Sequence, residues 1–166
     1  MRVFRAREKA LKVLGGNPDD AFRILPKYKQ VIGNSNHGNV VELDSESDPD
    51  QEEEDVIAGN VVERLQLFRR FFVGLAGLKK EFLAGCAPFI FFDGCHLRGK
   101  YGGVLLSAMG TDPDCGIFPV AYAVVETENK ESWGFFLKCL EKFIGPFDDG
   151  KPWNFMTDRQ KVYSLH

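Results

Sequence analysis

Apolar residues form three nearly continuous runs in the second half of the chain, at positions 88–99, 104–111 and 117–126. The segments between them, GKYGG and TDPDCG, are rich in the glycine, proline and aspartate residues that turns favour. Short apolar runs bounded by such segments predict three consecutive strands. Because the runs are almost uninterrupted, we expect these strands to be covered on both faces.

A helix and a fourth strand are predicted to follow. Within 128–144 the apolar residues recur at helical spacing, with Asn129 or Ser132 near the cap, and the stripe consists of Trp133, Phe136, Leu137, Leu140 and Ile144. WNFMTD, residues 153–158, is predicted to be a strand. This order predicts an α/β fold with a mixed α+β sheet. Since only eight residues follow Asp158, we expect the sheet layer to be incomplete there, with an exposed apolar edge.

The first half of the chain is predicted to be mainly helical. Residues 3–14 predict a short helix, and a second helical segment begins near Asn17 and breaks or kinks at Pro26. A loop and a short strand at 40–43 follow. Residues 57–84 contain no proline and place apolar residues at helical spacing, so they predict one long amphipathic helix.

Charged residues are segregated along the chain, although the net charge is only −3. Residues 44–55 carry eight acidic side chains and no basic one, which predicts a solvated acidic linker, with an acidic interaction tail as the alternative. The linker would separate an N-terminal helical accessory region, 1–43, from a domain at 56–166. That domain has thirteen basic and twelve acidic residues. Any nucleic-acid binding must therefore come from local patches, which excludes a generally basic, histone-like binder.

The cysteines and the apolar runs indicate a soluble intracellular protein without a membrane partner. The four cysteines have neither CxxC spacing nor the pattern of a disulfide scaffold, and we interpret them as reduced, partly buried thiols: Cys86, Cys95, Cys115 and Cys139. The N-terminal segment lacks the continuous apolar stretch of a secretory signal. No apolar run reaches the roughly 20 residues that a membrane-spanning helix needs.

Two aspartates carry the candidate chemistry. Asp93 follows the apolar run FIFF, and Asp158 ends the predicted strand WNFMT. If their strands are parallel neighbours joined by a helical crossover, the two carboxylates would converge. A divalent cation such as Mg²⁺ would relieve their repulsion and leave coordination positions for phosphate oxygens. Two structural alternatives stay open: Asp93 precedes Gly94 and could belong to a turn, and Asp158 could cap a helix.

Other polar residues near the aspartates carry weaker predictions. On a regular strand His96 would face away from Asp93, so a polar packing role is favoured over metal ligation. Four basic residues flank the aspartates in sequence and could contact DNA phosphates or simply face solvent: Arg98, Lys100, Arg159 and Lys161.

Three sequence blocks resemble the motifs of the MULE (Mutator-like element) transposase domain: FFDGCHLRGKYGGVLLSAMGTD, IFPVAYAVVETENKESWGFFL and FMTDRQK. The resemblance runs from about Gly85 to Lys161, and residues 5–43 resemble the region that precedes this domain in plant members. It implies a ribonuclease-H-like fold with a DDE triad. Asp93 matches the first aspartate of that triad and Asp158 the second. It also implies Mg²⁺ or Mn²⁺ as cofactor, a nuclear location, DNA at transposon ends as substrate, and a homo-oligomer as a further expectation.

The chain departs from the family pattern at its ends. The third carboxylate, a glutamate in a later helix, has no counterpart before His166, and VYSLH replaces the expected continuation after DRQK. We therefore expect an incomplete ribonuclease-H-like core with an N-terminal helical region, a transposase fragment that is catalytically incomplete alone. The alternatives are a domesticated, far-red-impaired-response-like DNA-binding transcription regulator or scaffold, and a decayed gene model without function.

Overall fold

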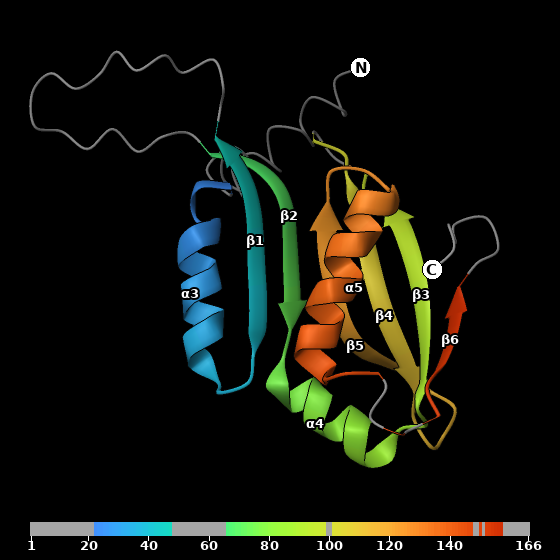
Figure 1. The fold of residues 1–166 in the computed structure, drawn as a ribbon. Helices are drawn as coiled ribbons and strands as arrows, with labels where there is room; N and C mark the ends of the chain where they lie inside the picture. The colour runs from blue at the N-terminus through green and yellow to red at the C-terminus, as the bar shows by residue number, and fades with distance from the viewer. Residues whose placement is uncertain (1–21, 48–65, 99–100, 148–149, 151, 158–166) are drawn as a thin grey trace, which may run out of the picture.

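A computed structural model describes residues 22–47, 66–98, 101–147, 150 and 152–157. Three helices and six strands lie in this part of the chain (Figure 1). In chain order they are α3 (Leu25–Ser35), β1 (Val40–Ser47), β2 (Gln66–Gly74), α4 (Ala76–Gly85), β3 (Phe89–His96), β4 (Val104–Thr111), β5 (Ile117–Val125), α5 (Lys130–Ile144) and β6 (Asn154–Thr157).

The six strands form one mixed sheet in the order β1-β2-β5-β4-β3-β6. β3, β4 and β5 are a consecutive antiparallel meander, and β1 and β2 extend the sheet beyond β5 in the same antiparallel manner. β6 instead pairs in parallel with β3, because α5 carries the chain back across the sheet before β6 begins. The predicted mixed α/β fold is confirmed, as are the three consecutive strands, the helix after them and the fourth strand.

One face of the sheet is covered by α5, and the main hydrophobic core lies between them (Figure 1). The helix begins with a reciprocal capping box, in which the Ser132 amide donates to the Asn129 side chain and the Asn129 amide donates to the Ser132 hydroxyl. Both predicted cap residues therefore act together. In this core the buried Phe136 and Leu140 of α5 meet fully buried side chains of the sheet, among them Phe72, Leu106 and Val125.

The other two helices cover smaller parts of the sheet. α3 lies on the face opposite α5, over β1 and β2, where Val41, Phe71 and Val73 form a second buried cluster. α4 lies across the end of the sheet (Figure 1). Its Phe82 ring is 1% exposed and occupies the space that a side chain on Gly110 would need, because an added Cβ would lie 2.4 Å from a ring carbon. α4 thereby closes the core at the end of β4.

The predicted helix at 57–84 is confirmed only in its last part, where α4 begins at Ala76, and it is wrong for residues 66–74, which form β2. In β2, Phe71 and Val73 face α3, whereas Phe72 and Gly74 face α5, as the two-residue period of a strand requires. The strand is held by antiparallel pairing to β1 on one side and β5 on the other. Residues 57–65 lie outside the described part.

One N-terminal prediction is confirmed and another is corrected. Helical residues 22–23 are separated from α3 by a turn at Ile24, and Pro26 lies in the first turn of α3, so the predicted break at this proline is confirmed. The acidic linker cannot begin at residue 44, because β1 continues to Ser47 and Asp44 lies opposite Arg70 of β2. The predicted helix at 3–14 and residues 48–55 lie outside the described part, and the division into an accessory region and a domain stays a prediction.

Arg70 joins β1, β2, β5 and α5 from a position that is only 7% exposed. Its Nη2 lies 2.8 Å from Oε1 of Glu126, its Nη1 donates to the main-chain oxygen of Glu131, and Asp44 lies 3.9 Å away. Burial acts to raise the pKa of Glu126, but the hydrogen bond from Arg70, a main-chain hydrogen bond and the charges of Arg70 and Arg69 together outweigh it, and the pKa is lowered. The guanidinium is therefore a structural anchor at the start of α5.

Surface properties also bear on the predictions. The thiols of Cys95 and Cys115 are exposed and that of Cys139 is buried, so the expectation of partly buried thiols is wrong for the first two.

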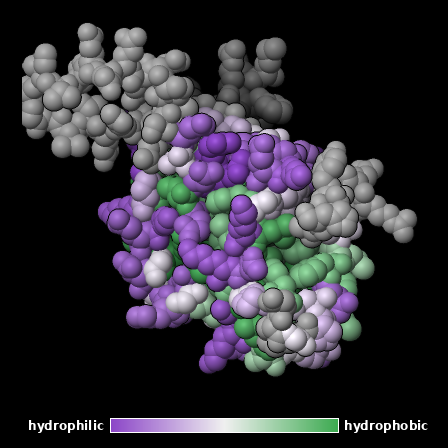
Figure 2. Space-filling view, viewed as in Figure 1, coloured by the Kyte–Doolittle hydropathy of each residue, from purple (hydrophilic) through white to green (hydrophobic). Residues whose placement is uncertain are grey.

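Figure 2 shows hydrophobic side chains gathering toward β6 on the face that carries α5. β6 is an edge strand with Phe155 42% and Met156 52% exposed, as predicted for this edge. Among the described residues, no helix is long and apolar enough to cross a membrane.

Candidate functional site

Asp93 lies inside β3, directly opposite Ser107 of β4. Its neighbours Ile90 and Phe92 are buried beneath α5, so the alternation of the strand directs Asp93 to the opposite face of the sheet, where it is exposed. Gly94 continues the ladder opposite Leu106. Asp93 is therefore not part of a turn.

The strand beside Asp93 is β6, the one that leads to the second aspartate. The parallel pairing runs from Phe89 opposite Asn154 to Phe92 opposite Thr157. The residues immediately before Asp93 and Asp158 therefore lie side by side on adjacent strands. This confirms that the two strands are parallel neighbours joined by a helical crossover. Asp158 itself lies outside the described residues, so its distance from Asp93 stays a prediction.

Asp93 also lines a hollow of about 590 Å³ between the strands and the β4–β5 turn. Most of its other walls are apolar, including Phe91, Met109, Ile117 and Met156. Ile117 and Met156 are 79% and 52% exposed, so the hollow opens onto the surface. The hollow therefore combines apolar walls with one exposed carboxylate, which can attract a positively charged group of a ligand.

The turn at the end of this hollow is internally braced. The Asp112 carboxylate accepts hydrogen bonds from the main-chain amides of Asp114 and Gly116, at 3.0 and 2.6 Å. Cys115, which lines the hollow, is held there in a left-handed conformation with φ of 62°. The brace fixes the turn that forms one wall of the hollow.

Residues 89–165 match the family model of the MULE transposase domain. The match begins at the first residue of β3 and includes both aspartates, and it indicates a transposase-family origin for this segment. No curated protein and no solved structure matched the chain.

Within the MULE-matched segment, sequence reasoning missed Glu128. This residue lies in the loop between β5 and α5, and its carboxylate atoms lie 3.1–3.2 Å from the place where a Cβ on Gly94 would stand. The signal available in the sequence was the glycine after Asp93. It predicted a turn, whereas the structure uses it to make room for a neighbouring carboxylate.

The other predicted residues of the MULE-matched segment are only partly placed. His96 is exposed at the end of β3, opposite Val104, so it does not have the predicted packing role. Arg98 is exposed just beyond that strand, and Lys100, Arg159 and Lys161 lie outside the described residues. Phosphate contacts by these residues stay a prediction. Within the described ranges, no three histidine, cysteine or acidic residues come together as a metal site.

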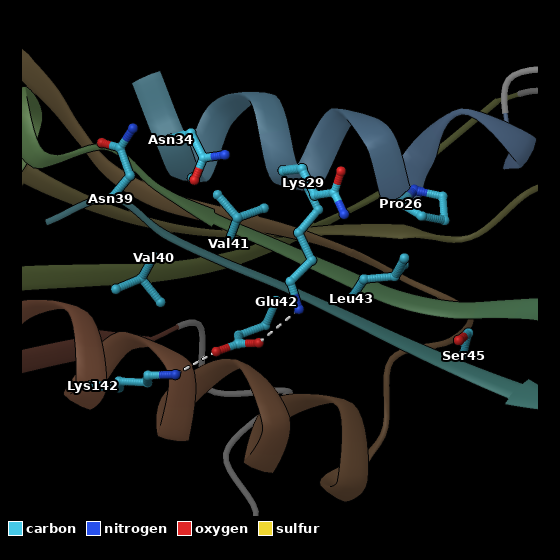
Figure 3. A pocket seen from close by; sticks show the side chains of 12 residues that line it. Pro26, Lys29, Asn34, Asn39, Val40, Val41, Glu42, Leu43, Ser45 and Lys142 are labelled. Atoms are coloured by element: carbon cyan, nitrogen blue, oxygen red, sulfur yellow. Dashed lines mark hydrogen bonds and ion pairs between the residues drawn. The ribbon is translucent and has the colours of Figure 1, made fainter. Parts of the chain in front are cut away.

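A second hollow, of about 620 Å³, runs along the edge of β1 between α3 and α5 (Figure 3). Glu42 bridges the two helices there, since Lys142 and Lys29 approach its oxygens to 2.5 and 3.2 Å. Burial acts to raise the pKa of Glu42, but the hydrogen bonds from both lysines prevail and the pKa is lowered. The three charges satisfy one another, so this hollow is better explained as a structural clamp than as a reaction site.

Proposed function

We propose that this chain carries the nuclease part of a Mutator-like DDE transposase, or of a protein derived from one, with a ribonuclease-H-like fold. In this proposal Asp93 and Asp158 together bind Mg²⁺ or Mn²⁺ and act on DNA. The match of residues 89–165 to the MULE transposase domain supports the family origin. The meander β3-β4-β5, followed by α5 and a parallel β6 beside β3, supports the fold assignment.

The observation that carries the proposal is the pairing of Phe92 with Thr157. If this parallel register continues by one residue, Asp93 and Asp158 stand opposite each other. They would also project from the same face of the sheet, because residues paired in a parallel ladder share a face. Met156, two positions before Asp158, lines the hollow together with Asp93. The proposed pair therefore faces this hollow, away from α5.

The chemistry of the two carboxylates fits a hard divalent cation. Carboxylate oxygens are the ligands that Mg²⁺ prefers, and Mg²⁺ is commonly held by one or two carboxylates with water and phosphate oxygens completing the shell. Asp93 is exposed, so it can meet an ion together with a DNA phosphate. The bound ion would supply a Lewis acid for phosphodiester chemistry. The part played by the chain is to hold two carboxylates at adjacent strands and to leave one side of them open.

Divalent-cation binding by the whole chain tests this proposal without requiring turnover. Isothermal titration with Mn²⁺ should show binding to the unmodified protein and its loss in Asp93→Asn and in Asp158→Asn. Asp114→Asn is the matched control, because Asp114 is an exposed acid in the β4–β5 turn and makes its hydrogen bond through the main chain. Equal Mn²⁺ affinity in Asp93→Asn and the unmodified protein would contradict the proposal.

DNA binding gives a second test that separates the enzyme from a regulator. A transposase-type site should bind a branched or nicked DNA more tightly when Mn²⁺ or Ca²⁺ is present, and Asp93→Asn should remove that gain. A domesticated DNA-binding regulator or scaffold would bind DNA equally with and without the cation. The proposal also includes a nuclear location and a plant origin within the family. Microscopy of a tagged chain in cells tests the first, and comparison with sequences of plant and other family members tests the second.

A further inference from the structure

The loop between β5 and α5 reaches the strand that carries Asp93. Glu128 of this loop places both carboxylate oxygens and the carboxyl carbon within 3.1–3.2 Å of a Cβ built on Gly94. The backbone of Gly94 is in the ordinary extended range, so no left-handed conformation calls for glycine there. A side chain at this position would press on the Glu128 carboxylate, which would have to shift by a few tenths of an ångström. The Glu128 carboxylate therefore packs directly against the position that a Cβ at residue 94 would take.

Trp133 of α5 holds the same carboxylate from the other side. Its indole Nε1 donates a hydrogen bond of 3.3 Å to Oε1 of Glu128. The indole ring also meets Phe92 edge to face, with ring centroids 6.2 Å apart. Phe92 and Gly94, the two neighbours of Asp93, are thus both held on the α5 side, one by Trp133 and the other by Glu128.

The Asp93 side chain itself depends on that backbone. Ser107 donates to the main-chain oxygen of Asp93, and no described residue forms a hydrogen bond or ion pair with the Asp93 carboxylate. The direction of the carboxylate therefore follows from the position of β3 at residues 92–94. A small displacement of a metal ligand changes affinity strongly, because a cation binds well only when its ligands are already placed.

We propose that Glu128, anchored by Trp133, is a positioning residue that fixes β3 at Gly94 and so aims the Asp93 carboxylate toward the cation. This inference rests on the proposed function of Asp93. Its action requires an oxygen acceptor of this length and volume, and not a negative charge. Glutamine supplies the same acceptor, whereas alanine removes it and leaves a gap beside Gly94.

The experiment compares Glu128→Ala with Glu128→Gln by Mn²⁺ titration of the whole chain. Loss of a residue that orients a metal ligand typically lowers affinity about 10- to 100-fold. We expect a loss of this size in Glu128→Ala and affinity within about threefold of the unmodified protein in Glu128→Gln. Glu131→Ala is the matched control for charge, because Glu131 is exposed and contacts Arg70 through its main-chain oxygen.

The outcomes separate this inference from the proposed function. Equal losses in Glu128→Ala and Glu128→Gln would overturn it, since they would make the charge itself the active element. Unchanged affinity in Glu128→Ala would overturn it too. If the unmodified chain binds no Mn²⁺, the proposed function fails, and amide hydrogen exchange at residues 93–95 decides the positioning claim. Faster exchange in Glu128→Ala, restored in Glu128→Gln, supports it, and unchanged exchange refutes it.

Discussion

Substitution of Gly74 by alanine is expected to destabilise the protein, and the size of the loss follows from one close contact. A Cβ at this position would lie 2.7, 2.8 and 2.9 Å from three carbons of the Phe143 ring. Carbon atoms at rest are about 3.5–4.0 Å apart, so the ring would have to move by nearly 1 Å. Phe143 is only 1% exposed and packs beside Phe72, which leaves it little space for this movement.

Overpacking of a buried site typically costs about 1–3 kcal/mol. Replacing glycine also lowers the conformational entropy of the unfolded chain, which stabilises the folded protein by about 0.4–1 kcal/mol. The expected net loss at Gly74 is therefore about 1–2 kcal/mol. Gly77 provides the control, because it lies in the first turn of α4 with no atom within 4 Å of an added Cβ. Alanine there should leave stability unchanged or raise it by up to ~1 kcal/mol.

Urea unfolding, followed by tryptophan fluorescence and far-ultraviolet circular dichroism, measures both effects. With a slope of about 2 kcal/mol per molar, the Gly74→Ala midpoint should fall by about 0.5–1 M. The Gly77→Ala midpoint should stay or rise. In a continuous helix through both positions, alanine would stabilise each of them by a similar amount. Stabilisation by Gly74→Ala would therefore refute the strand assignment of β2 and its packing against α5.

Three further predictions address the cap, the clamp and the thiols. Asn129→Ala should lower stability by about 1 kcal/mol through loss of the capping box, and an unchanged midpoint would show that the cap contributes nothing. The pKa of Glu42 is lowered on folding, so its contribution to stability is present above its unfolded value near 4.5 and is lost as the pH falls through the lower folded pKa. Glu42→Gln should therefore make the loss of stability below that pH less steep, and an equally steep profile would argue against the clamp. Burial raises the pKa of Cys139 to about 11, so a thiol reagent should modify Cys95 and Cys115 in the native protein and Cys139 only on unfolding, and rapid labelling of Cys139 would contradict its burial.

The sequence was most informative where local signals and tertiary structure agree. The meander β3-β4-β5 and helix α5 are bounded by turn residues and a cap that lie next to them in the chain. β2 was missed because Phe68, Phe72 and Leu75 are spaced as on a helix. The interaction that makes it a strand is distant: Arg70 is buried by pairing with Glu126, fifty-six positions later. No local pattern reveals that partner.

In the candidate site too, local sequence signals predicted some features, whereas features that depend on distant contacts were missed. Asp93 could be selected from its position after an apolar run, and the parallel neighbour of its strand could be predicted from the helix that separates the two. Glu128 could not, because its role depends on a carboxylate lying over a glycine of another strand. The only sign in the sequence was Gly94, whose small size has several explanations until the packing is known.

Because β1 and β2 are paired, residues 48–65 connect two adjacent strands of one sheet. Ser47 and Gln66 lie opposite each other at the ends of these strands, so both ends of residues 48–65 are fastened to one sheet. Replacing this stretch by a short glycine–serine turn should be tolerated, because each halving of such a loop changes closure entropy by only about 0.6 kcal/mol. A single protease cut within it should yield two fragments that stay associated without a covalent link. The same position would suit circular permutation or the insertion of a reporter protein.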